Sequence, residues 1–216
     1  MSPSKRIFDI VLAIVLLVLL APVMAVIAAL IWSVDGRPIF YVSLRARDPV
    51  RNFSLWKFRT MTDDPADSGV TGGDKRARIT RTGKVLRRIR LDELPQLWNV
   101  LRGDMSFVGP RPPLPRYVKM YPEIYRKVLA SRPGLTGLAT LAFHRSEERI
   151  LARCRTAGET ERAYTRRCIP RKAQLDLAYA ANRSICSDAL LIVLTAMGQK
   201  GRRLLKYRLK RRQSAK

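Results

Sequence analysis

A long apolar segment near the N-terminus constrains the fold of this chain more than any other feature. The stretch from Ile7 to Trp32 is apolar apart from Asp9 and is interrupted by Pro22. A helix needs about 20 apolar residues to cross the hydrocarbon core of a bilayer, so the segment is long enough. It also exceeds the apolar region of roughly 7–15 residues in a secretory signal, and no A-x-A cleavage site follows. We therefore expect a retained membrane segment rather than a cleaved leader.

Positive charge on both flanks bears on how this segment lies in the membrane. Lys5 and Arg6 precede it and Arg37 follows it, so the positive-inside rule favours the cytoplasmic side for both ends. Pro22 removes a helical hydrogen bond and clashes with the preceding turn. These features predict a re-entrant helix that dips into the membrane and returns, with the N-terminus and Arg37 on the cytoplasmic side. A kinked helix that spans the membrane is the alternative.

Length and charge limit the class of protein. The chain has 216 residues, enough for one domain with a core and a few added elements. Its 42 Lys and Arg residues against 17 Asp and Glu give a formal charge of +25, which predicts a polyanionic partner such as nucleic acid, acidic lipid or a phosphorylated small molecule. Three cysteines without metal-ligand spacing suggest neither a disulfide framework nor a zinc site, and they fit a reducing compartment.

The rest of the chain alternates short strand-like and helical patterns. Strands are predicted at Ile39–Leu44 and Phe53–Phe58, a surface loop at Met61–Asp74, helical segments interrupted near Asp92 within Ile79–Leu101, helices at Tyr117–Leu129 and Ala173–Met197, and an exposed helical insertion at Ser146–Arg167. The tail Lys200–Lys216 is basic and has no acid. It is expected either to lie on anionic headgroups as an amphipathic helix or to be a solvated, disordered tail.

The densest cluster of chemically useful side chains surrounds Asp92 and Glu93. Pro95 is tolerated in the first turn of a helix, so a helix is predicted to begin near Asp92 and to place both carboxylates at its positive end. An ordinary helix cap would look the same. Arginines flank the pair on both sides, Arg87 and Arg111 among them, and guanidinium groups bind phosphate well. Two acids among arginines are also able to ligate Mg²⁺ together with substrate phosphate oxygens.

Four motifs in this order resemble the bacterial sugar transferase family, the monotopic phosphoglycosyl transferases that act on polyprenyl phosphate. The motifs are Lys57-Phe58-Arg59-Thr60-Met61, Leu91-Asp92-Glu93-Leu94-Pro95-Gln96-Leu97, Gly103-Asp104-Met105-Ser106-Phe107-Val108-Gly109-Pro110-Arg111-Pro112 and Arg132-Pro133-Gly134-Leu135-Thr136-Gly137. The likeness begins at Lys5-Arg6-Ile7-Phe8-Asp9 and extends, with gaps, to the helix around Asp176 and Tyr179. The length matches the small members of the family.

The resemblance implies an activity and the residues that carry it. Asp92 would attack the sugar-bearing phosphate of a UDP-sugar, release UMP and hold a covalent phosphosugar, which undecaprenyl phosphate would then accept. Glu93 would help, either by holding Mg²⁺ with Asp92 or by activating the lipid phosphate. Arg87 and Arg111 match the family's phosphate-binding arginines. This would be the first membrane step of glycan or exopolysaccharide assembly; the sugar and the oligomeric state stay open.

The resemblance also implies an architecture and a location. We expect a compact, mostly helical α+β catalytic domain at residues 37–199, a re-entrant membrane helix at residues 1–36 and a basic membrane-surface tail at residues 200–216. The chain would sit on the cytoplasmic face of the bacterial inner membrane, in contact with its lipid and with no nucleic acid partner.

The sequence departs from the family at the nucleotide-sugar pocket. Past Gly137, the family's usual Arg falls on His144, with Arg145 beside it. A neutral imidazole is a poorer phosphate ligand than a guanidinium, so Arg145 is predicted to supply the missing charge. The alternative is that His144 is an ordinary loop residue.

A different class of function competes with the transferase. A membrane-tethered basic module would bind nucleic acid or an acidic polymer, but aromatic residues do not alternate with the basic ones as a base-stacking platform requires. Release of UMP from a UDP-sugar distinguishes the two. A membrane phosphatase, the third reading, would deliver the sugar to water instead of to lipid.

Overall fold

The computed structural model describes residues 1–62, 64, 70 and 72–205. The domain is α+β and mostly helical, as predicted. Its elements in chain order are α1 (Pro3–Val34), β1 (Phe40–Ala46), β2 (Asn52–Phe58), η1 (Gly73–Arg78), α2 (Arg81–Ile89), η2 (Leu91–Glu93), α3 (Gln96–Arg102), β3 (Ser106–Val108), α4 (Pro115–Met120), α5 (Pro122–Val128), β4 (Gly134–Thr136), α6 (Leu138–Leu151), α7 (Ala157–Ala163), η3 (Tyr164–Cys168), α8 (Ile169–Ala181) and α9 (Ile185–Ala196).

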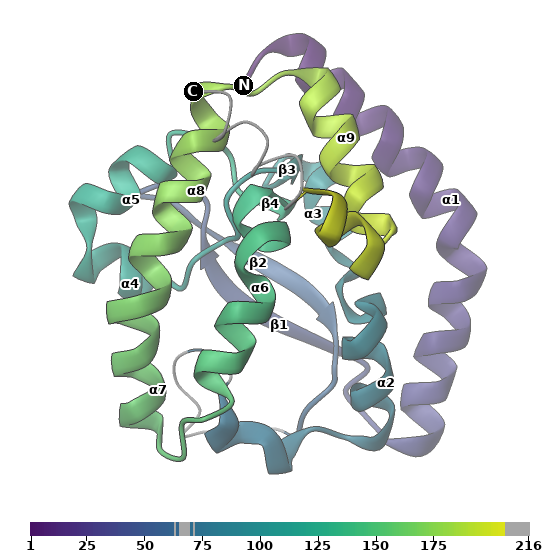
Figure 1. Cartoon of the computed structure of the whole chain (residues 1–216). Coiled ribbons are helices and arrows are strands. Elements are labelled where there is room, and N and C mark those ends of the chain that lie inside the picture. Colours follow the sequence, from purple (N-terminus) through teal and green to yellow (C-terminus); the bar gives the residue numbers. More distant parts are fainter. Residues whose placement is uncertain (63, 65–69, 71, 206–216) are drawn as a thin grey trace.

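The apolar segment forms one continuous helix, α1, with Pro22 inside it. Figure 1 shows α1 curving along one edge of the molecule, with α7 and α8 along the opposite edge. Little of α1 is buried: Ala13 and Ile31 are fully covered, whereas Val18 is 73% and Val26 69% exposed. Its length and composition suffice to cross a membrane. The helix therefore presents an apolar outer face, and re-entry stays a prediction.

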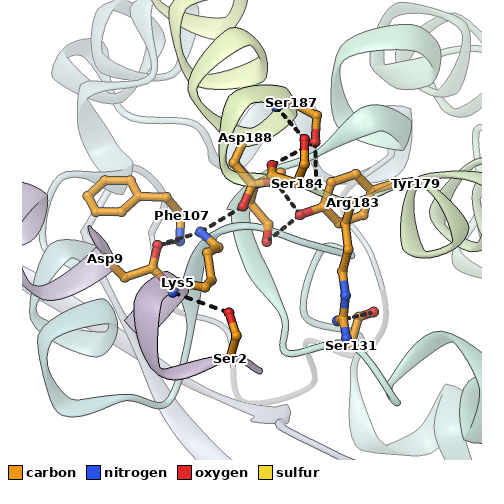
Figure 2. Close-up of polar contacts among 11 residues, drawn as sticks. Ser2, Lys5, Asp9, Phe107, Ser131, Tyr179, Arg183, Ser184, Ser187 and Asp188 are labelled. Carbon is orange, nitrogen blue, oxygen red and sulfur yellow. Dashed lines mark hydrogen bonds and ion pairs between the residues drawn. The ribbon is translucent and has the colours of Figure 1, made fainter. Parts of the chain in front are cut away.

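Polar contacts fix both ends of α1 to the domain. Near the N-terminus, Lys5 Nζ lies 2.5 Å from Asp9 Oδ1 and 3.0 Å from Asp188 Oδ2 of α9, and the hydroxyl of Tyr179 in α8 donates to Asp188 Oδ1 at 2.6 Å (Figure 2). Asp9 and Asp188 are almost completely buried. Because a buried charge is tolerated only when it is paired, this polar cluster holds α1 against α8 and α9.

At its other end, α1 contacts the segments that lead into the interior. Arg59 Nη2 donates to the carbonyl oxygens of Asp35 and Gly36 at 2.6 and 2.7 Å, and Thr82 Oγ1 donates to Asp35 Oδ2. Ile27 and Ile31 pack against Phe58 and Leu86 in a small apolar cluster. The C-terminal half of α1 is thus seated directly on β2 and α2.

The four described strands form two small sheets, each of two strands, among the helices. β1 and β2 form an antiparallel hairpin with register Phe40 to Phe58 and Ala46 to Asn52, close to the two predicted strands. β3 and β4 pair in parallel, Ser106 with Gly134 and Val108 with Thr136, and the sequence analysis did not predict them.

Several predicted helices differ from the observed ones for local reasons. The single helix predicted over Tyr117–Leu129 is two helices, α4 and α5, because Pro122 lacks the amide that would continue the first. The helix predicted over Ala173–Met197 is also broken: α8 ends at Ala181, and Ser184 begins α9 with a capping box to Ser187. The tail prediction concerns mainly residues 206–216, which lie outside the described residues.

Candidate active site

A cleft of about 330 Å³ brings together the sequence motifs. Its walls come from the β1–β2 hairpin, the segment after β2, α2, η2, the Pro-Arg-Pro segment after β3, and one face of α6. Of the described residues that line it, eight are Lys or Arg and four are acids. The basic residues are Arg45, Lys57, Arg59, Arg78, Arg87, Arg90, Arg111 and Lys172, and the acids are Asp92, Glu93, Glu147 and Glu148.

A sharp turn between α2 and α3 places Asp92 and Glu93 in this cleft. Arg90 ends α2 in the left-handed conformation, with φ 63°, and its amide donates to the Leu86 carbonyl. The chain then makes the single turn η2 before Pro95 and α3. The predicted interruption near Asp92 is confirmed, but the pair lies on a separate turn and not at the start of the following helix.

Glu93 is held by three cations. Arg111 Nη2 donates to Glu93 Oε1 at 2.5 Å, Arg90 Nη2 lies 3.4 Å from Oε2, and Lys57 Nζ lies 4.0 Å from Oε1. Burial opposes ionisation of Glu93, but the charges of Arg111, Arg90 and Lys57 outweigh it and hold the pKa of the carboxyl well below its usual range. Glu93 is therefore a permanent anion that orders the cations around it.

Asp92 differs from its neighbour in having no such partners. Among the residues that the structure describes, no side chain forms a hydrogen bond or ion pair with its carboxylate, although only 8% of Asp92 is exposed. Burial and then the charge of Glu93 raise the pKa of Asp92. The site thus contains one carboxylate engaged by cations and, next to it, one that is available to a ligand.

The hairpin supplies basic residues that the sequence analysis did not single out as ligands. Tyr41 pairs with Lys57 across the hairpin, and Arg45 lies four residues along from Tyr41, so all three project from one face into the cleft. Burial, together with the charge of Arg111, lowers the pKa of Lys57 to about 8. The two-residue alternation of side chains along β1 is the signal that could have identified Arg45.

Glycines of two motifs bring Arg111 to Glu93. A Cβ on Gly134 would lie 2.1 Å from the amide nitrogen of Gly109, and one on Gly137 would lie 2.2 Å from the Gly109 carbonyl oxygen. The two motifs therefore pack backbone against backbone, which any side chain would prevent. This packing fixes the Pro110-Arg111 segment that follows Gly109.

The structure brings four of the five predicted site residues together, with Arg145 as the exception. Asp92, Glu93, Arg87 and Arg111 line the cleft, and Arg145 does not. His144 lies on the cleft face of α6, and one residue along an α-helix turns by about 100°, so Arg145 projects elsewhere. Burial and the charge of Arg90 lower the pKa of His144, so its imidazole is neutral near pH 7.

A further buried acid, Asp176, lies behind the cleft. Asp176 of α8 shares a small cavity with Arg111, Tyr125 and Lys172. Burial raises the pKa of Asp176 to about 7, with the charge of Lys172 opposing the rise and that of Glu147 adding to it. Lys172 is engaged by Glu147, whose Oε1 accepts from Nζ at 2.9 Å.

The described residues contain no group of three or more His, Cys, Asp or Glu side chains that would form a metal site by themselves. Asp92 and Glu93 are adjacent carboxylates, and within the described part of the chain Asp92 has no side-chain partner. Mg²⁺ is commonly bound by one or two carboxylates, with water and substrate phosphates completing its shell. The donor set therefore fits that ion as a joint ligand of protein and substrate.

The chain belongs to the bacterial sugar transferase family, whose sequence pattern matches residues 1–200. It is 40% identical over 137 residues to the uncharacterized sugar transferase EpsL of Bacillus subtilis, covering 63% of this chain and 67% of that protein. It is 36% identical over 201 residues to the undecaprenyl-phosphate glucose phosphotransferase of Komagataeibacter xylinus, covering 89% of this chain and 35% of that protein. It is 32% identical to the exopolysaccharide production protein ExoY of Sinorhizobium fredii, covering 89% and 83%.

Proposed function

We propose that this chain transfers a sugar 1-phosphate from a UDP-sugar to undecaprenyl phosphate through a covalent intermediate on Asp92. The names of several relatives support the reaction class. One is a UDP-glucose:undecaprenyl-phosphate glucose-1-phosphate transferase of Klebsiella pneumoniae, and another an N-acetylgalactosaminephosphotransferase of Aeromonas hydrophila that uses the same lipid acceptor. The chain spans 39% and 33% of those two proteins.

One observation carries the proposal: an unpartnered carboxylate lies among cations in a cleft that adjoins the apolar helix. Phe58 lines the cleft and also packs against Ile27 and Ile31 of α1. A lipid phosphate held at the outer face of α1 would therefore lie close to Asp92. The soluble nucleotide sugar would enter the cleft from water. An enzyme that joins a soluble donor to a membrane-bound acceptor needs both approaches.

The proposed reaction has two displacements at one phosphorus atom. A carboxylate oxygen of Asp92 attacks the phosphorus that bears the sugar, the bond from that phosphorus to the bridging oxygen breaks, and UMP leaves. An oxygen of undecaprenyl phosphate then attacks the same phosphorus, the bond to Asp92 breaks, and the carboxylate is restored. Covalent catalysis of this kind divides one difficult displacement into two easier ones.

The side chains around Asp92 suit charge stabilisation. Arg87 has no side-chain partner within the described part of the chain and lines the cleft, so it is available to a donor phosphate. Arg111 keeps its charge because Glu93 raises the pKa of its guanidinium despite burial. Preorganised cations of this kind stabilise a phosphoryl group during transfer without reorganising.

Glu93 is better suited to bind a cation as a permanent carboxylate than to act as a general base. A general base works best with a pKa near the operating pH, and the pKa of Glu93 lies far below it. We propose that Asp92 and Glu93 hold Mg²⁺ together with substrate phosphate oxygens. When bound, the ion would offset charge on the transferring phosphoryl group.

The proposed location follows from α1 and from the two substrates. The outer face of α1 would contact lipid of the bacterial inner membrane, and the cleft would face the cytoplasm, where nucleotide sugars are made available. The division into a membrane helix at 1–36, a catalytic domain at 37–199 and a basic tail at 200–216 belongs to the same proposal.

Trapping of the intermediate tests the proposal. Purified protein is incubated with Mg²⁺ and a panel of UDP-sugars, including UDP-glucose and UDP-N-acetylgalactosamine, without lipid acceptor. Intact-protein mass spectrometry should show a sugar-phosphate adduct on the parent and none on Asp92→Asn, with UMP in the solution. An Asp92→Asn variant that forms the adduct or keeps full turnover would refute the mechanism. Failure to release UMP from any UDP-sugar would favour a binding module.

A further inference from the structure

A second basic hollow lies outside the cleft, between α6, α7 and η3. It has a volume of about 570 Å³, and five arginines line it: Arg149, Arg153, Arg162, Arg166 and Arg167. None of the four motifs shared with the sugar transferases contains these residues. They belong to the charged insertion that the sequence analysis predicted, and the transferase mechanism leaves them without a role.

The hollow and the cleft lie on opposite sides of α6. Thr140 and His144 face the cleft, whereas Arg149 and Arg153 face the hollow. At about 100° per residue, Arg149 lies roughly on the far side of α6 from positions 140 and 144, and Arg153 follows just after the helix ends at Leu151. A ligand in the hollow would therefore not contact Asp92, and the two sites can be probed separately.

The arginines of the hollow have no counter-ion among the residues that the structure describes. Within the described residues none of the five forms a side-chain ion pair or hydrogen bond. Of the described residues that line the hollow, Glu159 is the only acid, and its Oε2 already accepts from the Arg155 amide at 2.8 Å. Like charges gathered around a concavity repel one another, and a bound anion relieves that repulsion.

The framework behind these arginines is fixed. The π-helical turn η3 buries Tyr164 and Cys168, and Tyr164 packs on Tyr117 with ring centroids 4.8 Å apart. The hydroxyl of Tyr117 donates to Glu161 at 2.8 Å, which ties α7 to α4. Because the opposite side of this turn is anchored in the core, Arg166 and Arg167 are held toward the hollow.

We propose that this hollow binds a soluble ligand that carries two or more phosphate groups, such as a nucleoside polyphosphate. Several guanidinium groups around one concavity suit several phosphates, because each can grip a phosphate through two hydrogen bonds. The floor is less polar, with Ile150, Cys154 and Ala163, and offers a surface to a ring or sugar. The volume lies within the usual range for small-molecule sites.

The position of the hollow favours a soluble ligand over a lipid headgroup. α7 lies along the edge of the molecule opposite α1 (Figure 1), whose outer face is the apolar surface suited to lipid. A headgroup of the membrane that α1 contacts would have to reach across the domain.

The binding of inorganic tripolyphosphate to the purified full chain, measured by titration calorimetry, tests this inference. Arg162→Ala/Arg166→Ala should weaken binding by about tenfold or more, since hydrogen bonds to charged groups are lost at two positions. The matched control Arg155→Ala/Arg171→Ala removes the same charge from exposed neighbours that do not line the hollow, and it should leave the affinity within about twofold. Inorganic monophosphate should bind more weakly than tripolyphosphate.

Three results would overturn the proposal. An equal loss of affinity in Arg155→Ala/Arg171→Ala would mean that net charge alone attracts tripolyphosphate. A loss of affinity in the cleft variant Lys57→Ala/Arg87→Ala, with no loss in Arg162→Ala/Arg166→Ala, would place tripolyphosphate in the cleft. Vesicles rich in phosphatidylglycerol that bind through the hollow arginines, while tripolyphosphate does not, would identify a lipid site. All three arms are independent of whether the chain transfers sugar phosphate.

Discussion

The change Glu93→Gln tests the view that Glu93 holds the cleft together electrostatically. Arg111 Nη2 lies 2.5 Å from the Glu93 carboxylate, and only 8% of Glu93 is exposed. Removing one partner of a buried ion pair costs about 3–5 kcal/mol, because the other charge stays behind unpaired. Since the side chain of Arg111 is 33% exposed, we expect the lower end, about 3 kcal/mol.

This loss should be visible as a change in the unfolding temperature. For a chain of this size, 1 kcal/mol corresponds to about 2–4 °C, so Glu93→Gln should unfold roughly 6–12 °C below the parent. The assay is thermal unfolding in detergent, followed by tryptophan fluorescence. The pKa of Glu93 in the folded protein lies below its unfolded value, so its contribution is complete at neutral pH and disappears only in strong acid.

Glu123→Gln is the matched control. Glu123 also accepts from an arginine, Arg126, at 2.7 Å, but both side chains are at least 70% exposed. A surface ion pair of this kind contributes about 0–1 kcal/mol. A Glu93→Gln variant that unfolds within about 2 °C of Glu123→Gln would refute the reasoning, and Asp92→Asn should resemble the control in stability while losing activity.

Three further predictions concern α1 and the buried acid of α8. Lys5→Met leaves Asp9 and Asp188 buried without a cation and should lower stability by about 3–5 kcal/mol in denaturant unfolding, whereas Lys5→Arg should keep most of it. The raised pKa of Asp176 means that the folded protein binds an extra proton between about pH 4 and 7, so its stability falls as the pH rises through that range. The unfolding temperature of the parent should therefore decrease from pH 5 to pH 8, and that of Asp176→Asn should decrease less. Cysteines placed at the N-terminus and at Arg37 should both resist impermeant labelling from outside intact cells, and labelling of either would contradict re-entry.

Local chemistry made part of the fold predictable. The strand-like patterns at Ile39–Leu44 and Phe53–Phe58 located β1 and β2. β3 and β4 were missed because each has only three residues, all of them buried in β3 and two of the three in β4, so neither is long enough to show an alternating pattern. Their pairing depends on the contact of Gly109 with Gly134, which are distant in sequence.

The candidate site was predictable to the extent that its residues sit in motifs. Asp92, Glu93 and Arg111 could be chosen from residue type and spacing. The sequence did not show that Glu93 is paired with cations while Asp92 is not. The pairing of Glu93 with Arg111 requires β3 and β4 to be in place, and the isolation of Asp92 follows from the turn at η2. Arg145 was predicted to line the cleft but does not. Which residues of α6 face the cleft depends on how the helix is oriented, and the sequence alone does not show that α6 begins at Leu138.

The contact of Lys5 with Asp188 joins the two ends of the described chain and bears on the order in which the protein is completed. During synthesis α1 leaves the ribosome well before α9, which carries Asp188. Until α9 arrives, the first turns of α1 lack the contact with Asp188 and are held by the ion pair of Lys5 with Asp9 and by Arg6, which donates to the carbonyl oxygens of Val100 and Leu101 at 2.7 Å. The docking of α1 to the domain is therefore completed only after α9 has been made.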